Sequence, residues 1–122
     1  MSDFENGVSQ KECFISIHKR YNEYDGHDWC HTISNAMIVI AALLYGNGDF
    51  GKSICMAVEA GFDTDCNGAT VGSILGMANE IDSIDEAWKN PINDTLHTSI
   101  FGVGTVKISD RVKQTLKHVH RI

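Results

Sequence analysis

Two aspartates separated by one residue, Asp63 and Asp65, are the strongest candidates for chemistry in this sequence. They lie in the segment Gly61-Phe-Asp-Thr-Asp-Cys-Asn-Gly68, between two apolar segments that have the composition of helices. At ~5 Å and an effective dielectric of about 20, two carboxylates repel each other by roughly 3 kcal/mol. A bound cation relieves that repulsion, and oxygen ligands favour hard ions such as Mg²⁺, Ca²⁺ or Mn²⁺. The segment is therefore a candidate half of a divalent-metal site; the alternative is that one aspartate caps the next helix.

Calcium binding of the EF-hand type is excluded by the spacing of the acidic residues. Residues 63–68 match the first six positions of an EF-hand loop, but the twelfth position, which needs a bidentate Glu, falls at Ile74. The next acidic residue on that segment is Glu80. Two carboxylates alone hold a metal weakly, and the remaining candidate aspartates form no second cluster in the sequence: Asp25, Asp28, Asp49, Asp82 and Asp85.

Hydrophobic periodicity and capping residues predict a mostly helical chain around this segment. We expect an all-α fold, a compact multi-helical domain of about five helices. The expected helices run from about Gln10 to Tyr21, from Thr32 to Tyr45, from a cap at Asp49 to Ala60, from Asn67 to Asn79, from a Ser83–Glu86 capping box through Trp88, and from a cap at Ser109 or Asp110 onward.

The segment Thr32–Tyr45 is apolar on nearly all sides, so it is expected to be the central helix, covered by several neighbours. Gly46-Asn-Gly48 ends it and should turn the chain into an antiparallel helical hairpin. In the helix after the acidic segment, Gly72 and Gly76 each cost about 1 kcal/mol relative to alanine. Their spacing predicts that a neighbouring helix or a ligand approaches that backbone closely.

Composition limits the classes of function. The 122 residues suit one domain, and a formal net charge of −6 argues against sequence-independent binding of nucleic acid. The N-terminus lacks the pattern of a signal peptide, and the longest apolar run, residues 36–45, is half the length of a membrane span. The four cysteines are widely spaced, which predicts reduced thiols in a cytoplasmic protein, three of them packed as small hydrophobes.

Three segments together resemble the C-terminal region of the ADP-ribosylglycohydrolase superfamily, which includes the dinitrogenase reductase-activating glycohydrolases. They are His31-Thr-Ile-Ser-Asn35-Ala, Ala42-Leu-Leu-Tyr-Gly-Asn-Gly-Asp-Phe50 and Gly61-Phe-Asp-Thr-Asp-Cys-Asn-Gly-Ala-Thr-Val-Gly-Ser-Ile-Leu-Gly76. The specific element is the Asp-Thr-Asp segment followed by a helix of small residues. The resemblance covers roughly Tyr24 to Trp88.

This resemblance implies an all-α hydrolase that uses two divalent cations, Mg²⁺ or Mn²⁺, to cleave an N- or O-glycosidic bond to ADP-ribose. Its substrate would be an ADP-ribosylated protein or a small ADP-ribosyl compound. It assigns Asp63 and Asp65 as metal ligands and places Cys66 where many members have a metal-binding Thr or Ser. A thiol is a soft ligand that matches Mg²⁺ poorly. Four further residues are predicted to contact substrate or support the site: Thr64, Asn67, His31 and Asn35.

The family's N-terminal Ser/Thr-Asp-Asp-Thr motif, which carries its other metal ligands, has no counterpart in this sequence. We therefore expect residues 1–122 to form a single domain that corresponds to a C-terminal fragment of a complete member and supplies one half of the metal site. A complementing N-terminal portion or a homo-oligomer would then be its partner. The alternative function is that of a catalytically inactive remnant that acts as a binding or helical interaction module.

Overall fold

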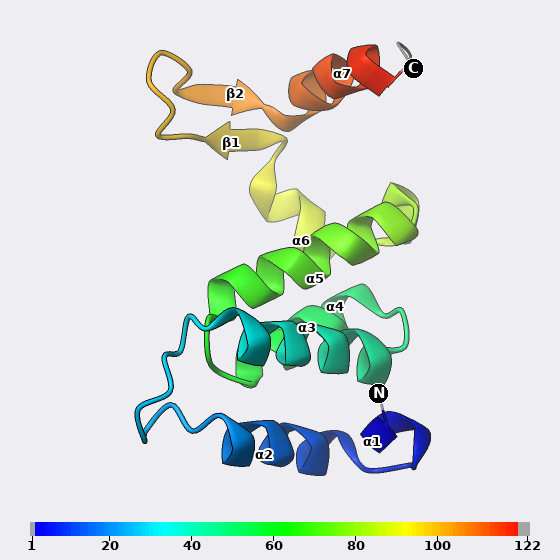
Figure 1. The fold of residues 1–122 in the computed structure, drawn as a ribbon. Coiled ribbons are helices and arrows are strands. Elements are labelled where there is room, and N and C mark those ends of the chain that lie inside the picture. The colour runs from blue at the N-terminus through cyan, green and yellow to red at the C-terminus, as the bar shows by residue number, and fades with distance from the viewer. Residues whose placement is uncertain (1, 120–122) are drawn as a thin grey trace. The chain divides into compact units, whose positions relative to one another are not determined.

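The computed structural model describes residues 2–119, which form seven α-helices, two 3₁₀ helices and a two-stranded sheet (Figure 1). The elements are α1 (Ser2–Glu5), α2 (Gln10–Arg20), α3 (Thr32–Gly46), α4 (Phe50–Glu59), α5 (Thr64–Ala78), η1 (Ile81–Ser83), α6 (Glu86–Lys89), η2 (Asn90–Ile92), β1 (Thr95–His97), β2 (Thr105–Lys107) and α7 (Ile108–Val119). They divide into an N-terminal unit, Met1–Ile84, and a C-terminal unit, Asp85–Ile122. The prediction of a mainly helical fold is confirmed, with more helices than the about five expected.

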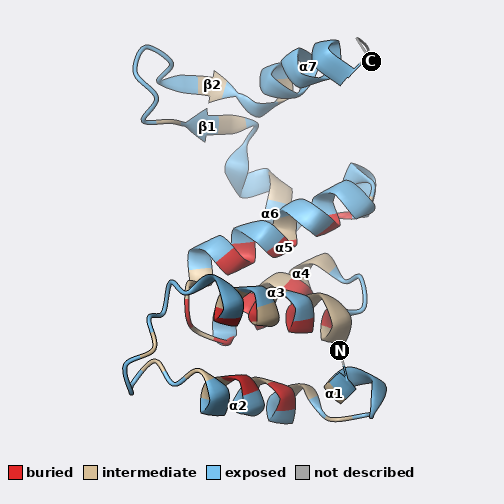
Figure 2. Cartoon of the chain, in the orientation of Figure 1, coloured by how far each residue is buried: buried red, intermediate tan, exposed pale blue. Residues whose placement is uncertain are grey.

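Helix α3 is the centre of the N-terminal unit, as its apolar composition predicts. It packs against α2, α4 and α5. Ile38 and Ala42 of α3 are completely buried, as are Ala57 of α4 and Val71 of α5. The buried stripes of these helices face one another in Figure 2, and their exposed sides face outward. Burial of this apolar surface is the main stabilising term of the unit.

The predicted hairpin of α3 and α4 is present, and its turn uses the residues that the sequence indicated. Asn47 and Gly48 both have positive φ, 52° and 82°, and the side chain of Asp49 caps α4 by accepting a hydrogen bond from Lys52 N at 2.8 Å. Gly46 is required by close packing, because a Cβ at this position would lie 1.8 Å from Ser53 Oγ.

Helix α5 differs from the prediction in its start and in its packing. It begins at Thr64, three residues earlier than expected, so the acidic segment forms the first turn of the helix. The close approach of α4 occurs at Gly68 and Gly72, where an added Cβ would lie 3.0 Å from Val58 and 3.3 Å from Ile54. At Gly76, no atom of a neighbouring described helix lies within 4 Å of such a Cβ, so the prediction of a closely packed helix at Gly76 is wrong.

In the C-terminal unit, β1 and β2 form an antiparallel hairpin in which Leu96 pairs with Val106. The sequence indicated only an irregular or briefly extended segment here. The cap of α7 is Asp94, whose carboxylate accepts hydrogen bonds from the backbone N–H and the hydroxyl of Ser109 at 2.8 and 2.7 Å. The predicted caps at Ser109 and Asp110 are therefore wrong, because both residues lie inside the helix.

The expected capping box at Ser83 is also wrong. Ser83 lies in η1 and donates its hydroxyl to Glu80 O, while the side chain of Asp85 caps α6 by accepting from Ala87 N. The short helix expected through Trp88 is present as α6, and Pro91 follows it in η2. Within residues 2–119, each helix is too short or too polar to be a candidate membrane span.

The cysteines are less buried than predicted. All four are free thiols, and Cys13 on α2 is the one that is buried. Cys30, Cys55 and Cys66 are exposed, which contradicts the expectation that three of the four pack as small hydrophobes. Two of the exposed thiols, Cys30 and Cys66, are close to the acidic segment.

Candidate metal centre

A strained turn at Gly61 and Phe62 connects α4 to the acidic segment. Gly61 and Phe62 both have positive φ, 84° and 57°, and a bulky residue in this conformation costs of order 1–3 kcal/mol. The turn is held because Phe62 is buried and its ring stacks on that of His18, with centroids 4.6 Å apart. His18 Nε2 is also hydrogen-bonded to Ala60 O at 2.7 Å. Helix α2 thus fixes the position at which α5 begins.

Asp63 is the N-cap residue of α5, yet its side chain makes no cap hydrogen bond. Aspartates at the same position of two other helices do cap: Asp49 accepts from Lys52 N and Asp85 from Ala87 N, each at 2.8 Å. A side-chain cap typically contributes about 1 kcal/mol to a helix. The structure therefore does not support the alternative in which Asp63 is present to cap the helix through its side chain.

Asn35, on the first turn of α3, holds the acidic segment in place. Its Oδ1 accepts from the backbone N–H of Asp63 at 3.0 Å and from the side-chain amide of Asn67 at 2.7 Å. Its Nδ2 donates to the carbonyl oxygens of Trp29 and His31, at 2.8 and 3.0 Å. Both ends of the amide are thus used, which determines its orientation and joins two segments that are distant in sequence, residues 29–35 and residues 63–67.

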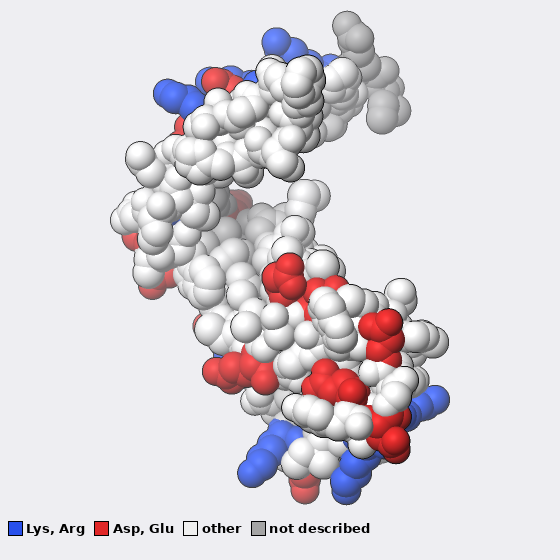
Figure 3. Space-filling view, turned by 90° about the vertical axis from the view of Figure 1, so that its left-hand side faces the viewer, with Lys and Arg blue, Asp and Glu red and all other residues white. Residues whose placement is uncertain are grey.

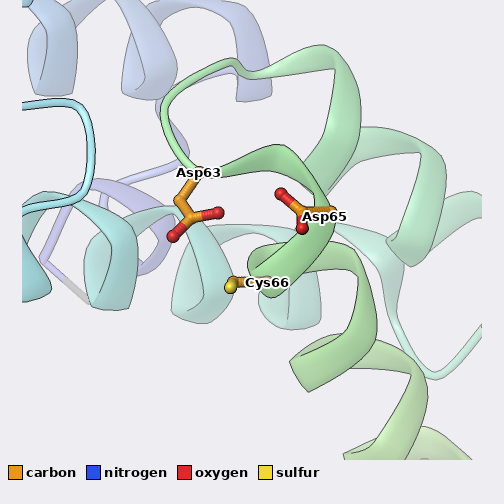
Figure 4. A group of neighbouring side chains, drawn as sticks. All are labelled: Asp63, Asp65 and Cys66. Atoms are coloured by element: carbon orange, nitrogen blue, oxygen red, sulfur yellow. The ribbon is translucent and has the colours of Figure 1, made fainter. Parts of the chain in front are cut away.

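The side chains of Asp63, Asp65 and Cys66 converge on one space beside the start of α5 (Figure 4). One carboxylate oxygen of each aspartate and the sulfur of Cys66 all lie within 4.8 Å of one another. Asp63 is half-buried, whereas Asp65 and Cys66 are exposed. We call these three residues the Asp-Asp-Cys group; it is the one group of at least three such ligands found within residues 2–119.

The pKa values of the two thiols near this group, those of Cys66 and Cys30, are both raised. For Cys66 the main causes are the hydrogen bond with the Asp63 carboxylate and the negative charge of that carboxylate. For Cys30 the main cause is desolvation, followed by the charges of Asp63, Asp28 and Asp65. Both thiols are thus protonated at neutral pH in the absence of a cation, and Cys30 is within electrostatic reach of the group.

The whole N-terminal unit is acidic. Residues 1–84 contain 12 Asp and Glu against four Lys and Arg, a formal net charge of −8, while residues 85–122 carry four against six, a net charge of +2. On the face of the N-terminal unit seen in Figure 3, acidic side chains gather, and basic ones lie at the end that carries α2. Such a field attracts cations and opposes the approach of anions.

The donor set fits a hard divalent cation in part. Asp63 and Asp65 provide the oxygen ligands that Mg²⁺ and Mn²⁺ prefer, close enough to share one ion after small side-chain rotations. The third donor does not fit Mg²⁺, because it is a thiol and not a hydroxyl or a carboxylate.

The other predicted site residues lie around this group. Asn67 is 2% exposed and donates to Asn35, and Thr64 is the first residue of α5, with its backbone N–H bonded to Phe62 O at 3.1 Å. His31 caps α3, its Nδ1 accepting from Ile33 N at 3.2 Å. Contact of these residues with a substrate stays a prediction.

Sequence reasoning missed two residues beside the site. His27 is hydrogen-bonded to the buried hydroxyl of Ser34 at 2.9 Å, and its ring lies 5.0 Å from that of His31. Cys30 stands in the same loop. Neither showed a recognisable spacing to Asp63, because the fold brings together segments more than 30 residues apart.

A family model described as ADP-ribosylglycohydrolase matches residues 5–118. The chain belongs to this family. The match extends beyond the region of resemblance read from the sequence and covers nearly all of the described residues. ADP-ribosylglycohydrolases are metal-dependent hydrolases, which agrees with the presence of a ligand group in this chain. No curated protein and no solved structure matches the chain.

Proposed function

We propose that this ADP-ribosylglycohydrolase-family chain provides part of a divalent-cation site for hydrolysis of an N- or O-glycosidic bond to ADP-ribose. The observation that carries the proposal is the Asp-Asp-Cys group at the start of α5, where Asp63 leaves its own helix uncapped and turns toward Asp65. Asp63 and Asp65 are its proposed ligands. Family membership supports the reaction class, and the geometry supports the choice of Asp63 and Asp65.

A divalent cation at this position would act as a template for hydroxyl groups and lower the pKa of a bound water. The protein's own contribution is positional. Asn35 holds the Asp63 backbone, and the stacked pair of Phe62 and His18 holds the turn before it. Thr64, His31 and Asn35 line the surroundings and are the proposed contacts to substrate. Asn67, which is buried, is proposed to support the site through its hydrogen bond to Asn35.

The proposed site is a half-site. The resemblance implies two cations in a complete member, whereas residues 2–119 contain one ligand group of three side chains. The remaining ligands would come from a complementing N-terminal portion of an ADP-ribosylglycohydrolase or from a second copy of this chain. This view also fits the strongly negative unit, which needs added positive charge before a pyrophosphate can approach.

Metal binding tests the ligand assignment. Calorimetric titration of the full chain with Mn²⁺ and Mg²⁺ should show binding that Asp63→Asn or Asp65→Asn abolishes. Asp49→Asn is the matched control, because Asp49 is an N-cap residue that does bond to its helix, and it should leave binding unchanged. If Asp63→Asn and Asp65→Asn leave the binding of Mn²⁺ unaltered, the assignment is wrong.

Hydrolysis tests the reaction. Release of ADP-ribose from ADP-ribosylated protein or from a small ADP-ribosyl conjugate should require the divalent ion and both aspartates. The single ligand group favours a second candidate, a module that binds ADP-ribose without turnover. Metal-dependent binding of ADP-ribose with no release from any conjugate, even when an N-terminal portion is added, would establish that second function and refute the first.

A further inference from the structure

The third donor of the Asp-Asp-Cys group is the thiol of Cys66, which is a poor ligand for the hard cations implied by the family resemblance. This mismatch affects which cation the group should bind. A thiol sulfur lies within 4.8 Å of one oxygen of each aspartate. We propose that Cys66 is a metal ligand and that the group therefore prefers a thiophilic divalent cation, of which Zn²⁺ and Co²⁺ are examples, over Mg²⁺. This inference rests on the proposed function, because it assumes that Asp63 and Asp65 bind the ion.

The placement of Cys66 supports the role of ligand. Its thiol does not pack in the core, as Cys13 does, but is exposed at the first turn of α5 and hydrogen-bonded to the Asp63 carboxylate. Its sulfur and the aspartate oxygens point into the same space in Figure 4.

The distances suit a compact ion after a small adjustment. Zinc binds sulfur at about 2.3 Å and carboxylate oxygen at about 2.0–2.2 Å in tetrahedral geometry, so neighbouring ligand atoms are about 3.5 Å apart. The separations of up to 4.8 Å must shorten by roughly 1 Å. Two of the three side chains are exposed and free to rotate by that amount.

The chemistry of the ligand atoms determines which divalent cation the Asp-Asp-Cys group binds most tightly. At a site with N, O or S ligands, affinity rises from Mn²⁺ to Co²⁺ and is high for Zn²⁺, and a thiolate increases this selectivity. Mg²⁺ demands six oxygens and gains nothing from sulfur. A hydroxyl in place of the thiol would reduce the preference for Zn²⁺ and Co²⁺, so Cys66→Ser is the informative substitution.

The experiment is a titration of the full chain with Co²⁺, followed by absorbance, because cobalt bound to a thiolate shows a sulfur-to-metal charge-transfer band in the near ultraviolet. The wild type should show this band, and excess Zn²⁺ should remove it. Cys55→Ser is the matched control, since Cys55 is an exposed thiol on α4 that does not belong to the group, and it should keep the band. Cys66→Ser and Cys66→Ala should lose it.

Affinity supplies the second measurement. Cys66→Ser should weaken Zn²⁺ binding by at least about tenfold, a loss that removal of even an outer partner of a metal ligand produces. Mn²⁺ binding should change much less. Circular dichroism of each variant shows whether α5 is intact, so a folding defect is recognised as such.

The outcomes separate the two proposals. Co²⁺ binding that requires Asp63 and Asp65 but shows no sulfur band overturns the role of Cys66 and leaves the proposed cation site in place. A band that persists in Cys66→Ser also overturns it and points to Cys30 as the sulfur donor. Binding that survives Asp63→Asn and Asp65→Asn refutes the cation site itself, and with it this inference.

Discussion

Replacing Asn35 with alanine tests whether α3 positions the candidate metal centre. The substitution removes the acceptor shared by the Asp63 backbone N–H and the Asn67 side-chain amide, at 3.0 and 2.7 Å. Both donors are partly buried, and a donor left without a partner costs about 1–3 kcal/mol. We therefore expect the free energy of unfolding of the N-terminal unit to fall by about 2–4 kcal/mol.

The assay is urea denaturation followed by circular dichroism, together with a Mn²⁺ titration. Asn79→Ala is the matched control, because the Asn79 amide makes one exposed hydrogen bond to Gly48 O at 3.1 Å and its loss should cost about 0.5–1 kcal/mol. Asn35→Ala should also weaken Mn²⁺ binding, since the Asp63 backbone loses its anchor. A loss of stability no larger than that of Asn79→Ala would refute the positioning role of Asn35.

Three further predictions concern packing, the turn and pH. Gly46→Ala should destabilise the N-terminal unit by about 1–3 kcal/mol in urea melts, because the new methyl group overlaps a serine hydroxyl of α4; Gly76→Ala, which enters open space, should stabilise it by about 0.5–1 kcal/mol. His18→Ala should cost about 1–2 kcal/mol by removing the hydrogen bond that holds the turn before α5, and an unchanged melt would contradict this. Hydrogen bonds from Ser109 lower the pKa of Asp94, so the cap of α7 should contribute stability above the ordinary carboxyl pKa and lose it as pH falls through the lowered value. NMR shifts of α7 across an acid titration should show this loss, and Asp94→Asn should remove the pH dependence.

The helices that the sequence predicts well are those whose signals are local. The apolar run of α3, the positive-φ pair Asn47 and Gly48, and the cap at Asp49 are all contained in one short segment, and each was confirmed. The start of α5 was placed too late because Asp, Thr and Cys are weak helix formers. Tertiary anchoring of the preceding turn overrides that weak propensity.

Features that depend on hydrogen bonds between residues far apart in the sequence could not be predicted from local sequence patterns. Asp94 caps a helix whose first turn is 15 residues further along the chain, and a local capping rule therefore chose Ser109 or Asp110. In the candidate site, the sequence singled out Asp63 and Asp65 by spacing, but the hydrogen bond from Asp63 to Asn35 spans 28 residues. The residues proposed to bind the cation are recognisable by type, whereas the residues that position them are recognisable only in the fold.

Because Asp63 does not cap α5 with its side chain, binding of a cation by Asp63 would affect how well the first turn of α5 is ordered. The first backbone amides of α5 lack the partner that an aspartate at this position provides to α4 and α6. An ion held by Asp63 and Asp65 accepts no hydrogen bond and cannot replace the missing cap, but it would fix both side chains, so part of its binding free energy would be the ordering of that turn. Removal of the ion by a chelator would then loosen the start of α5, while the α3–α4 hairpin keeps its packing.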